Sequence, residues 1–71
     1  MHIGKKIKEV MEQKHRSVIW VAKKINCERT NVYNIFERES INTGLLLKFC
    51  HILGHDFFKD LSEETFGRTR H

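Results

Sequence analysis

The most restrictive feature of the sequence is a stretch near its middle, residues 18–36, where apolar side chains recur at helical spacing in two short runs. The first run consists of Val18, Val21, Ala22 and Ile25, and the second consists of Val32, Ile35 and Phe36. Between the runs stands Asn26, one of the few residues other than glycine that adopts a left-handed conformation at low cost. The pattern predicts two short helices joined by a tight turn, the first supporting the second.

The second of these helices, about residues 28–37, presents a polar face to the outside if its aliphatic residues point inward. That face carries hydrogen-bonding side chains and almost nothing apolar: Arg29, Thr30, Tyr33, Asn34 and Glu37. Side chains of these types reach base edges and phosphates in the major groove of DNA. The composition of the face is equally compatible with an ordinary polar surface.

This stretch resembles the helix-turn-helix of the lambda-repressor-like (XRE, or Cro-type) family of DNA-binding proteins. The apolar and turn positions of that motif are matched in order by Val21, Ala22, Ile25, Asn26, Cys27, Val32 and Ile35. The resemblance covers roughly residues 3–61 and implies an all-α fold of five short helices that binds duplex DNA as a transcriptional regulator. The chain departs from the family at Val18, Asn26 and Glu28, where a glutamine, a glycine and a serine or threonine are usual.

The rest of the chain predicts three further helices. An amphipathic helix begins at Ile3 and fades near Lys14. A fourth helix begins at Asn42 or Thr43 and ends at Gly54, and a short fifth helix runs from Asp56 to about Leu61. Phe58 and Leu61 are expected to complete the core. Residues 1–66 are therefore expected to form a single domain, and residues 67–71 a disordered tail.

Contacts with the bases of a DNA duplex and contacts with its backbone are expected from different residues. Of the outward side chains of the second helix of the motif, those expected to contact bases are Arg29, Thr30, Tyr33 and Asn34. The expected contacts with the DNA backbone come from Arg16, Ser17, Asn31, Arg38, Asn42 and Thr43. Ser17 is also a good cap for the second helix, and Asn42 or Thr43 for the fourth, so plain capping without a ligand is the alternative at these positions.

Composition limits the other functions that the chain can have. Its 71 residues carry 13 Lys and Arg against 9 Asp and Glu, a net charge of +4 that permits nucleic-acid binding without requiring it. Cys27 and Cys50 are expected as small core residues in a reducing compartment. No apolar run approaches ~18 residues and no signal-peptide pattern is present, so a cytoplasmic protein without a membrane contact is expected. No spacing predicts a catalytic, metal, cofactor or small-molecule site, so an enzyme is not expected.

A competing function from another class is a protein-interaction module on the same fold, such as an antitoxin-like partner or an adaptor subunit. Its expected contact residues are Ile19, Trp20, Phe57 and Phe66, of which Phe57 and Phe66 are hard to bury in so small a domain. Trp20 is expected to be at least half covered within the monomer. In the resembling family the C-terminal end of the domain often forms a two-fold interface, which implies a possible homodimer.

Overall fold

The computed structural model describes residues 1–67, which form five helices and no strand. The helices are α1 (Ile3–Gln13), α2 (Val18–Lys24), α3 (Arg29–Phe36), α4 (Thr43–Leu53) and α5 (Phe57–Phe66). The predicted all-α class with five short helices is thus confirmed. The last helix is longer than expected, because it continues to Phe66 and has Gly67 as its C-terminal cap. The remainder of the expected tail, residues 68–71, lies outside the described residues.

The helix starts follow the sequence closely. Each of three side-chain oxygens accepts a hydrogen bond from a backbone N–H of the first helical turn. Ser17 accepts from Trp20 at 3.0 Å, Asn42 from Leu45 at 2.7 Å and Asp56 from Lys59 at 3.0 Å. These bonds satisfy donors that the helix itself leaves unpaired, so polar residues at these positions fix where α2, α4 and α5 begin.

Three helices end with the same local geometry: a residue of positive φ, followed by a residue whose N–H bonds back to the last turn of the helix. The residues are His15 (φ 58°), Asn26 (φ 58°) and Gly54 (φ 60°). After each of them, the next backbone N–H bonds to the carbonyl five residues earlier: to Met11 (2.9 Å), Ala22 (2.9 Å) and Cys50 (3.1 Å). This is the Schellman ending, which satisfies carbonyls at the helix C-terminus. Asn26 and Gly54 were expected in this role, whereas His15 was not.

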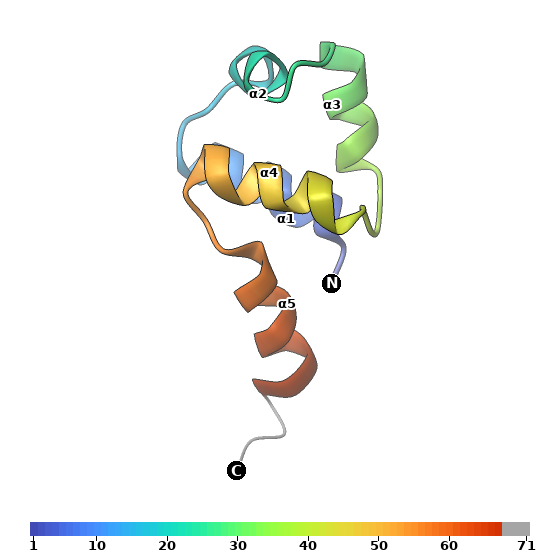
Figure 1. Cartoon of the computed structure of the whole chain (residues 1–71), viewed down its shortest axis with the longest axis vertical. Coiled ribbons are helices and arrows are strands. Elements are labelled where there is room, and N and C mark those ends of the chain that lie inside the picture. Colours follow the sequence, from blue (N-terminus) through green and yellow to red (C-terminus); the bar gives the residue numbers. More distant parts are fainter. Residues whose placement is uncertain (68–71) are drawn as a thin grey trace.

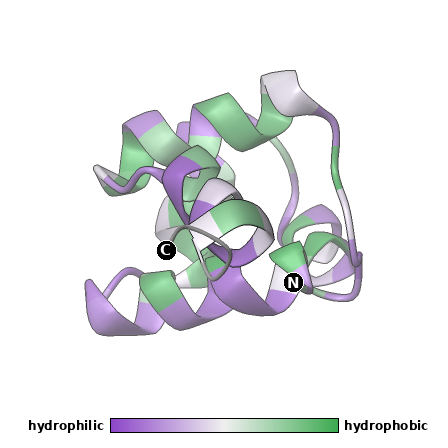
Figure 2. Cartoon of the chain, turned by 90° about the horizontal axis from the view of Figure 1, so that it is seen from below, coloured by the Kyte–Doolittle hydropathy of each residue, from purple (hydrophilic) through white to green (hydrophobic). Residues whose placement is uncertain are grey.

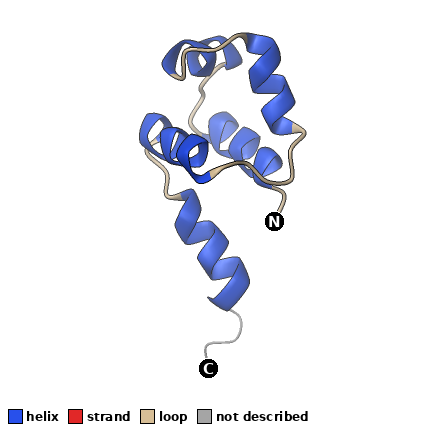
Figure 3. Ribbon diagram, turned by 45° about the vertical axis from the view of Figure 1, so that its right-hand side comes forward, coloured by secondary structure: helices blue, strands red, loops and turns tan. Residues whose placement is uncertain are grey.

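The core is shared by all five helices, but unequally. Its buried residues are Ile3, Ile7, Val10, Met11, Val21, Ala22, Val32, Ile35, Phe36, Leu46, Phe49, Leu53 and Phe57. Only one of these thirteen belongs to α5. The helices α1–α4, which we call the four-helix body, pack around one another, while α5 packs on α4 and extends away from them (Figures 1 and 3). The chain therefore measures 43 Å along its longest axis and 20 and 19 Å across.

The structure corrects the expectation for the two adjacent phenylalanines of α5. Phe57, expected to be hard to bury, is fully buried, whereas Phe58, expected to complete the core, is 37% exposed. Leu61 is only partly buried. The side of α5 that faces the core is thus the side of Phe57 rather than that of Phe58. Viewed from below, every helix carries both hydrophobic and hydrophilic positions, as one-sided burial requires (Figure 2).

A close backbone approach fixes α3 on α1. The N–H groups of Ile3 and Gly4 at the start of α1 donate to the carbonyl oxygens of Glu39 (3.0 Å) and Arg38 (2.9 Å), just after α3. A Cβ atom at Gly4 would overlap the carbonyl oxygens of Ile35 and Phe36. Only glycine allows the helices to approach this closely. This contact sets how the second helix of the α2–α3 pair is presented.

Candidate nucleic-acid interface

The α3 helix has one buried side and one open side. Val32 is fully buried, and Ile35 and Phe36 are 6% and 8% exposed, so the predicted inward orientation of these residues is confirmed. The four side chains expected to contact bases from the opposite side are all exposed: Arg29, Thr30, Tyr33 and Asn34. We call these four residues the α3 quartet. Since α3 is packed on α1 and α2 through its apolar side, the quartet is held on a fixed support.

The start of α3 lacks the cap that Ser17 gives α2. Glu28 occupies the N-cap position with extended backbone angles, φ −87° and ψ 157°, but its side chain accepts no capping hydrogen bond. No acidic residue lies in the first turn of α3 either. At this end of α3 the positive end of the helix dipole therefore lies next to one acidic residue, Glu28, and one basic residue, Arg29.

Tyr33 is the most constrained member of the quartet. Its ring meets the ring of Phe36 edge to face, with centroids 6.1 Å apart and planes at 86°. Phe36 belongs to the core, so this contact restrains the tyrosine while leaving it 56% exposed. The outer face of α3 thus carries an aromatic ring whose orientation is set from inside the protein.

Two open hollows flank the α3 quartet. The larger, about 630 Å³, lies between α2 and the start of α3 and is lined by Ile19, Ala22, Lys23, Cys27, Glu28, Arg29 and Thr30. The smaller, about 250 Å³, lies on the other side of α3 and is lined by Ile25, Cys27, Asn31, Asn34, Ile35, Arg38 and Leu45. The quartet therefore stands on a ridge, with polar groups at both edges that can donate hydrogen bonds.

The residues expected to contact the DNA backbone are distributed around this ridge, and all six are exposed: Arg16, Ser17, Asn31, Arg38, Asn42 and Thr43. The structure brings Asn31 and Arg38 together at the rim of the smaller hollow. Ser17 and Asn42 use their side-chain oxygens as helix caps, and Thr43 is the first residue of α4 rather than its cap. Arg16 does not lie beside Ser17's oxygen but extends over the ring of Trp20.

The aromatic residues expected at a protein interface fall into three different environments. Trp20 packs against the core and is partly buried, as expected, with Arg16 and Lys24 over its ring. Phe57 is wrong as an interface residue, because it is fully buried and contacts the ring of His55 at 4.7 Å. Phe66 is 61% exposed near the far end of α5. These three residues do not form one surface.

Sequence reasoning missed two contributors to the α2 surface: Lys23 lines the larger hollow, and Lys24 lies over Trp20. The spacing of four residues between Trp20 and Lys24 was a signal that they share one side of α2. Ile19, which the sequence places off the apolar stripe of its helix, is 50% exposed and also lines the larger hollow.

Charge is divided between the two ends of the molecule. Residues 13–27, which include all of α2, carry four Lys or Arg residues and no Asp or Glu. Residues 56–66, which include all of α5, carry one Lys against four Asp or Glu. A polyanion would therefore be attracted to the α2–α3 end and repelled from α5.

In residues 1–67 no group of three or more His, Cys, Asp or Glu side chains is placed to hold a metal ion. None of the helices α1–α5 is long and apolar enough to cross a membrane. Cys27 and Cys50 are both free and partly buried. Comparison of the chain with protein-family models, curated proteins and solved structures finds no match.

Proposed function

We propose that this chain is a transcriptional regulator that binds duplex DNA in a sequence-dependent manner, with α2 and α3 as a helix-turn-helix. The observation that supports the proposal is the orientation of α3. Its apolar side is buried, and its outward side consists of the exposed α3 quartet. A helix of this kind fits the major groove, where each base pair presents a distinct pattern of donors and acceptors.

The proposed mechanism separates base reading from backbone positioning. Arg29 donates two hydrogen bonds to the O6 and N7 atoms of a guanine, and Asn34 pairs with the N6 and N7 atoms of an adenine. Tyr33 and Thr30 contribute hydroxyl groups to neighbouring base edges or phosphates. Arg38 and Asn31, at the rim of the smaller hollow, donate to phosphates on one side of the groove. The charge asymmetry of the chain keeps acidic α5 away from the duplex.

The experiment is a selection of bound duplexes from a random pool, followed by affinity measurements on the selected site and on random DNA. Arg29→Ala and Asn34→Ala should each cost about 1–3 kcal/mol on the selected site and much less on random DNA. Lys48→Ala, which removes an exposed charge from α4, is the matched control and should change neither affinity much. Equal losses on both DNAs would assign Arg29 and Asn34 to the backbone instead.

The alternative function, a protein-interaction module, is favoured by one side of α5. Helical spacing gathers its uncharged residues on an arc opposite the acidic ones: Phe58, Leu61, Ser62, Thr65 and Phe66. A homodimer through this arc would place two DNA-binding surfaces in one particle, and selected half-sites about one helical turn apart would support it. Self-association without any duplex binding at low salt would favour the protein-interaction module over the regulator.

A further inference from the structure

Three side chains along one side of α2 form a continuous charged and aromatic row. The guanidinium carbon of Arg16 lies 4.5 Å from the ring centroid of Trp20, and the Nζ atom of Lys24 lies 5.5 Å from the same centroid. Trp20 and Lys24 are four residues apart on one side of α2, and Arg16, which precedes the N-cap Ser17, reaches the same ring from the connection before the helix. We call Arg16, Trp20 and Lys24 the α2 stripe.

The two cations of the α2 stripe are not neutralised by the protein. Within residues 1–67 neither Arg16 nor Lys24 forms an ion pair with a carboxylate, and both side chains are exposed. The sequence around them, residues 13–27, contains no acidic residue at all. Their positive charge therefore remains available to an anionic partner.

The ring of Trp20 supplies the rigid element of the stripe. It packs against the hydrophobic core on one side and receives the cations on its exposed face. The free energy gained when a cation lies over an aromatic ring is of the same order as the free energy lost when a long side chain is fixed at an interface. Trp20 thus holds Arg16 and Lys24 in place before any ligand arrives, which reduces the cost of binding.

We propose that the α2 stripe binds the phosphate backbone of the duplex, with Arg16 and Lys24 each neutralising one phosphate and Trp20 acting as a positioning residue. This inference rests on the proposed DNA binding and deepens it, since Trp20 and Lys24 then belong to the DNA surface rather than to a protein interface. The two charges lie 4.5 and 5.5 Å from the same ring centroid and are therefore at most 10 Å apart. This separation lets them meet neighbouring phosphates, which follow one another every ~3.4 Å of helix rise along a strand.

A polyanion fits this surface better than an apolar protein partner does. An apolar partner would have to displace or desolvate both cations to reach the ring of Trp20, and charged groups are costly to desolvate without a counter-charge. Phosphates instead meet the cations directly and leave their contact with the ring intact. The row continues towards Ser17 at the start of α2, on the same basic end of the molecule.

The salt dependence of duplex binding tests the role of the cations. Each neutralised phosphate adds about 0.9 to the slope of log affinity against log salt, so Arg16→Gln and Lys24→Gln should each lower the slope by about 0.9 and the double variant by about 1.8. Lys48→Gln on α4 is the matched control and should leave the slope unchanged. Unchanged slopes for Arg16→Gln and Lys24→Gln, with selective DNA binding retained, would overturn the inference and leave the proposed function standing.

A fluorinated tryptophan tests the positioning role without changing the shape of the core. Replacing Trp20 by a multiply fluorinated tryptophan weakens the attraction of the ring for cations, so affinity for the duplex should fall about two- to five-fold. The salt slope should stay unchanged, because both cations are still present. A purely structural role for the ring would leave affinity unaffected by fluorination, and this outcome would remove Trp20 from the proposal.

The fluorescence of Trp20, the only tryptophan in the chain, reports directly on the surface. Iodide should quench it readily in the free protein, because the two cations attract an anion, and duplex DNA should shield it. Quenching that is identical in the presence of saturating duplex would overturn the inference. Shielding that follows self-association without DNA would assign the stripe to a protein interface, and no duplex binding even at low salt would overturn both proposals.

Discussion

The four-helix body and α5 are built on different principles. The body contributes twelve of the thirteen buried core residues, and a backbone-to-backbone contact at Gly4 fixes its α1 and α3 helices on each other. The α5 helix contributes one buried residue, Phe57, to the core and packs mainly on α4 (Figure 1). Leu61 adds a partly buried apolar contact, and polar contacts join His55 to Asp60 and the N-terminal ammonium to Glu64 (2.6 Å).

This difference separates a rigid region from one that can adjust. An element held by many packed apolar groups moves only when the core opens, whereas an element with one fully buried side chain and a few peripheral contacts can open locally at lower cost. The proposed DNA-binding surface lies entirely on the body. The acidic α5, which we expect to open more easily, is free to serve a different purpose from the surface that meets DNA.

The largest expected effect compares the two buried phenylalanines of the two regions. Phe49→Ala in α4 should cost about 3–5 kcal/mol of unfolding free energy, because the cavity it leaves lies among fixed helices. Phe57→Ala should cost less, since α5 can detach and relieve the cavity. Chemical denaturation gives both free energies, and hydrogen exchange should show α1–α4 still protected in Phe57→Ala. If both variants lost the same free energy of unfolding, and if hydrogen-exchange protection in Phe57→Ala fell equally in all five helices, α5 would be as integral to the fold as α4.

A smaller effect is expected from the contact that fixes α3 within the body. Gly4→Ala forces a methyl group against the carbonyl oxygens of Ile35 and Phe36, which should cost about 1–3 kcal/mol. Gly44→Ala is the matched control, because a Cβ there has only Asn42 Oδ1 nearby at 3.4 Å. It should be neutral or stabilise α4 by about 0.5–1 kcal/mol. If Gly4→Ala left the free energy of unfolding unchanged, the α1–α3 contact would be able to relax. The four-helix body would then be less rigid than this comparison assumes.

Local chemistry explains which features of the fold were predictable. Ser17, Asn26, Gly54 and Asp56 act on their own backbone or on the next turn, so their roles could be assigned without knowing the tertiary structure. The left-handed conformation of His15 was missed, although histidine, like asparagine, is enriched among residues with positive φ. The sequence also led to the wrong phenylalanine of α5 in the core, Phe58 instead of Phe57. Which of the two points inward depends on how α5 docks on α4, and the local sequence does not encode this docking.

The same distinction applies to the candidate interface. The outward orientation of the α3 quartet follows from the spacing of Val32, Ile35 and Phe36, which the sequence displays directly. Only part of the α2 stripe could be predicted. The spacing of its residues can be read in the sequence, whereas the position of Arg16 and Lys24 over the ring of Trp20 is a side-chain conformation that only the structure shows. The two hollows beside α3 depend on how α2, α3 and α4 meet, and no local pattern encodes that.

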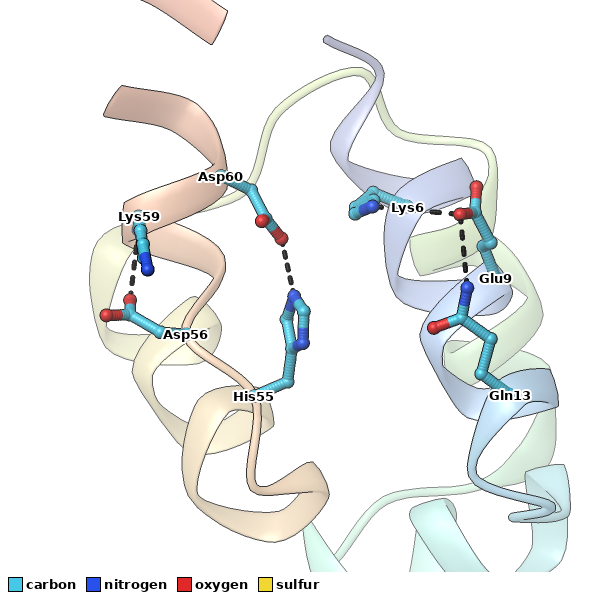
Figure 4. A network of polar contacts seen from close by, with 7 residues as sticks. All are labelled: Lys6, Glu9, Gln13, His55, Asp56, Lys59 and Asp60. Atoms are coloured by element: carbon cyan, nitrogen blue, oxygen red, sulfur yellow. Dashed lines mark hydrogen bonds and ion pairs between the residues drawn. The ribbon is translucent and has the colours of Figure 1, made fainter. Parts of the chain in front are cut away.

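The smallest expected effect tests the ionic attachment of α5. His55 Nε2 lies 2.5 Å from an Asp60 carboxylate oxygen, and both side chains are partly buried (Figure 4). Asp60 also lies in the first turn of α5, where a negative charge favours the helix. Asp60→Asn should therefore loosen α5 by up to about 1 kcal/mol, the range for a partly exposed ion pair.

Hydrogen exchange of residues 57–66 measures this loosening against the four-helix body as an internal reference. Glu63→Gln, an exposed acidic position on the same helix, is the control and should leave protection of α5 unchanged. Salt near 1 M should lower the protection of wild-type α5 towards that of Asp60→Asn, because it screens exposed charges over a few ångströms. If Asp60→Asn instead reduced protection equally in α1–α4, the ion pair would contribute to the common core, and the contrast between the two regions would fail.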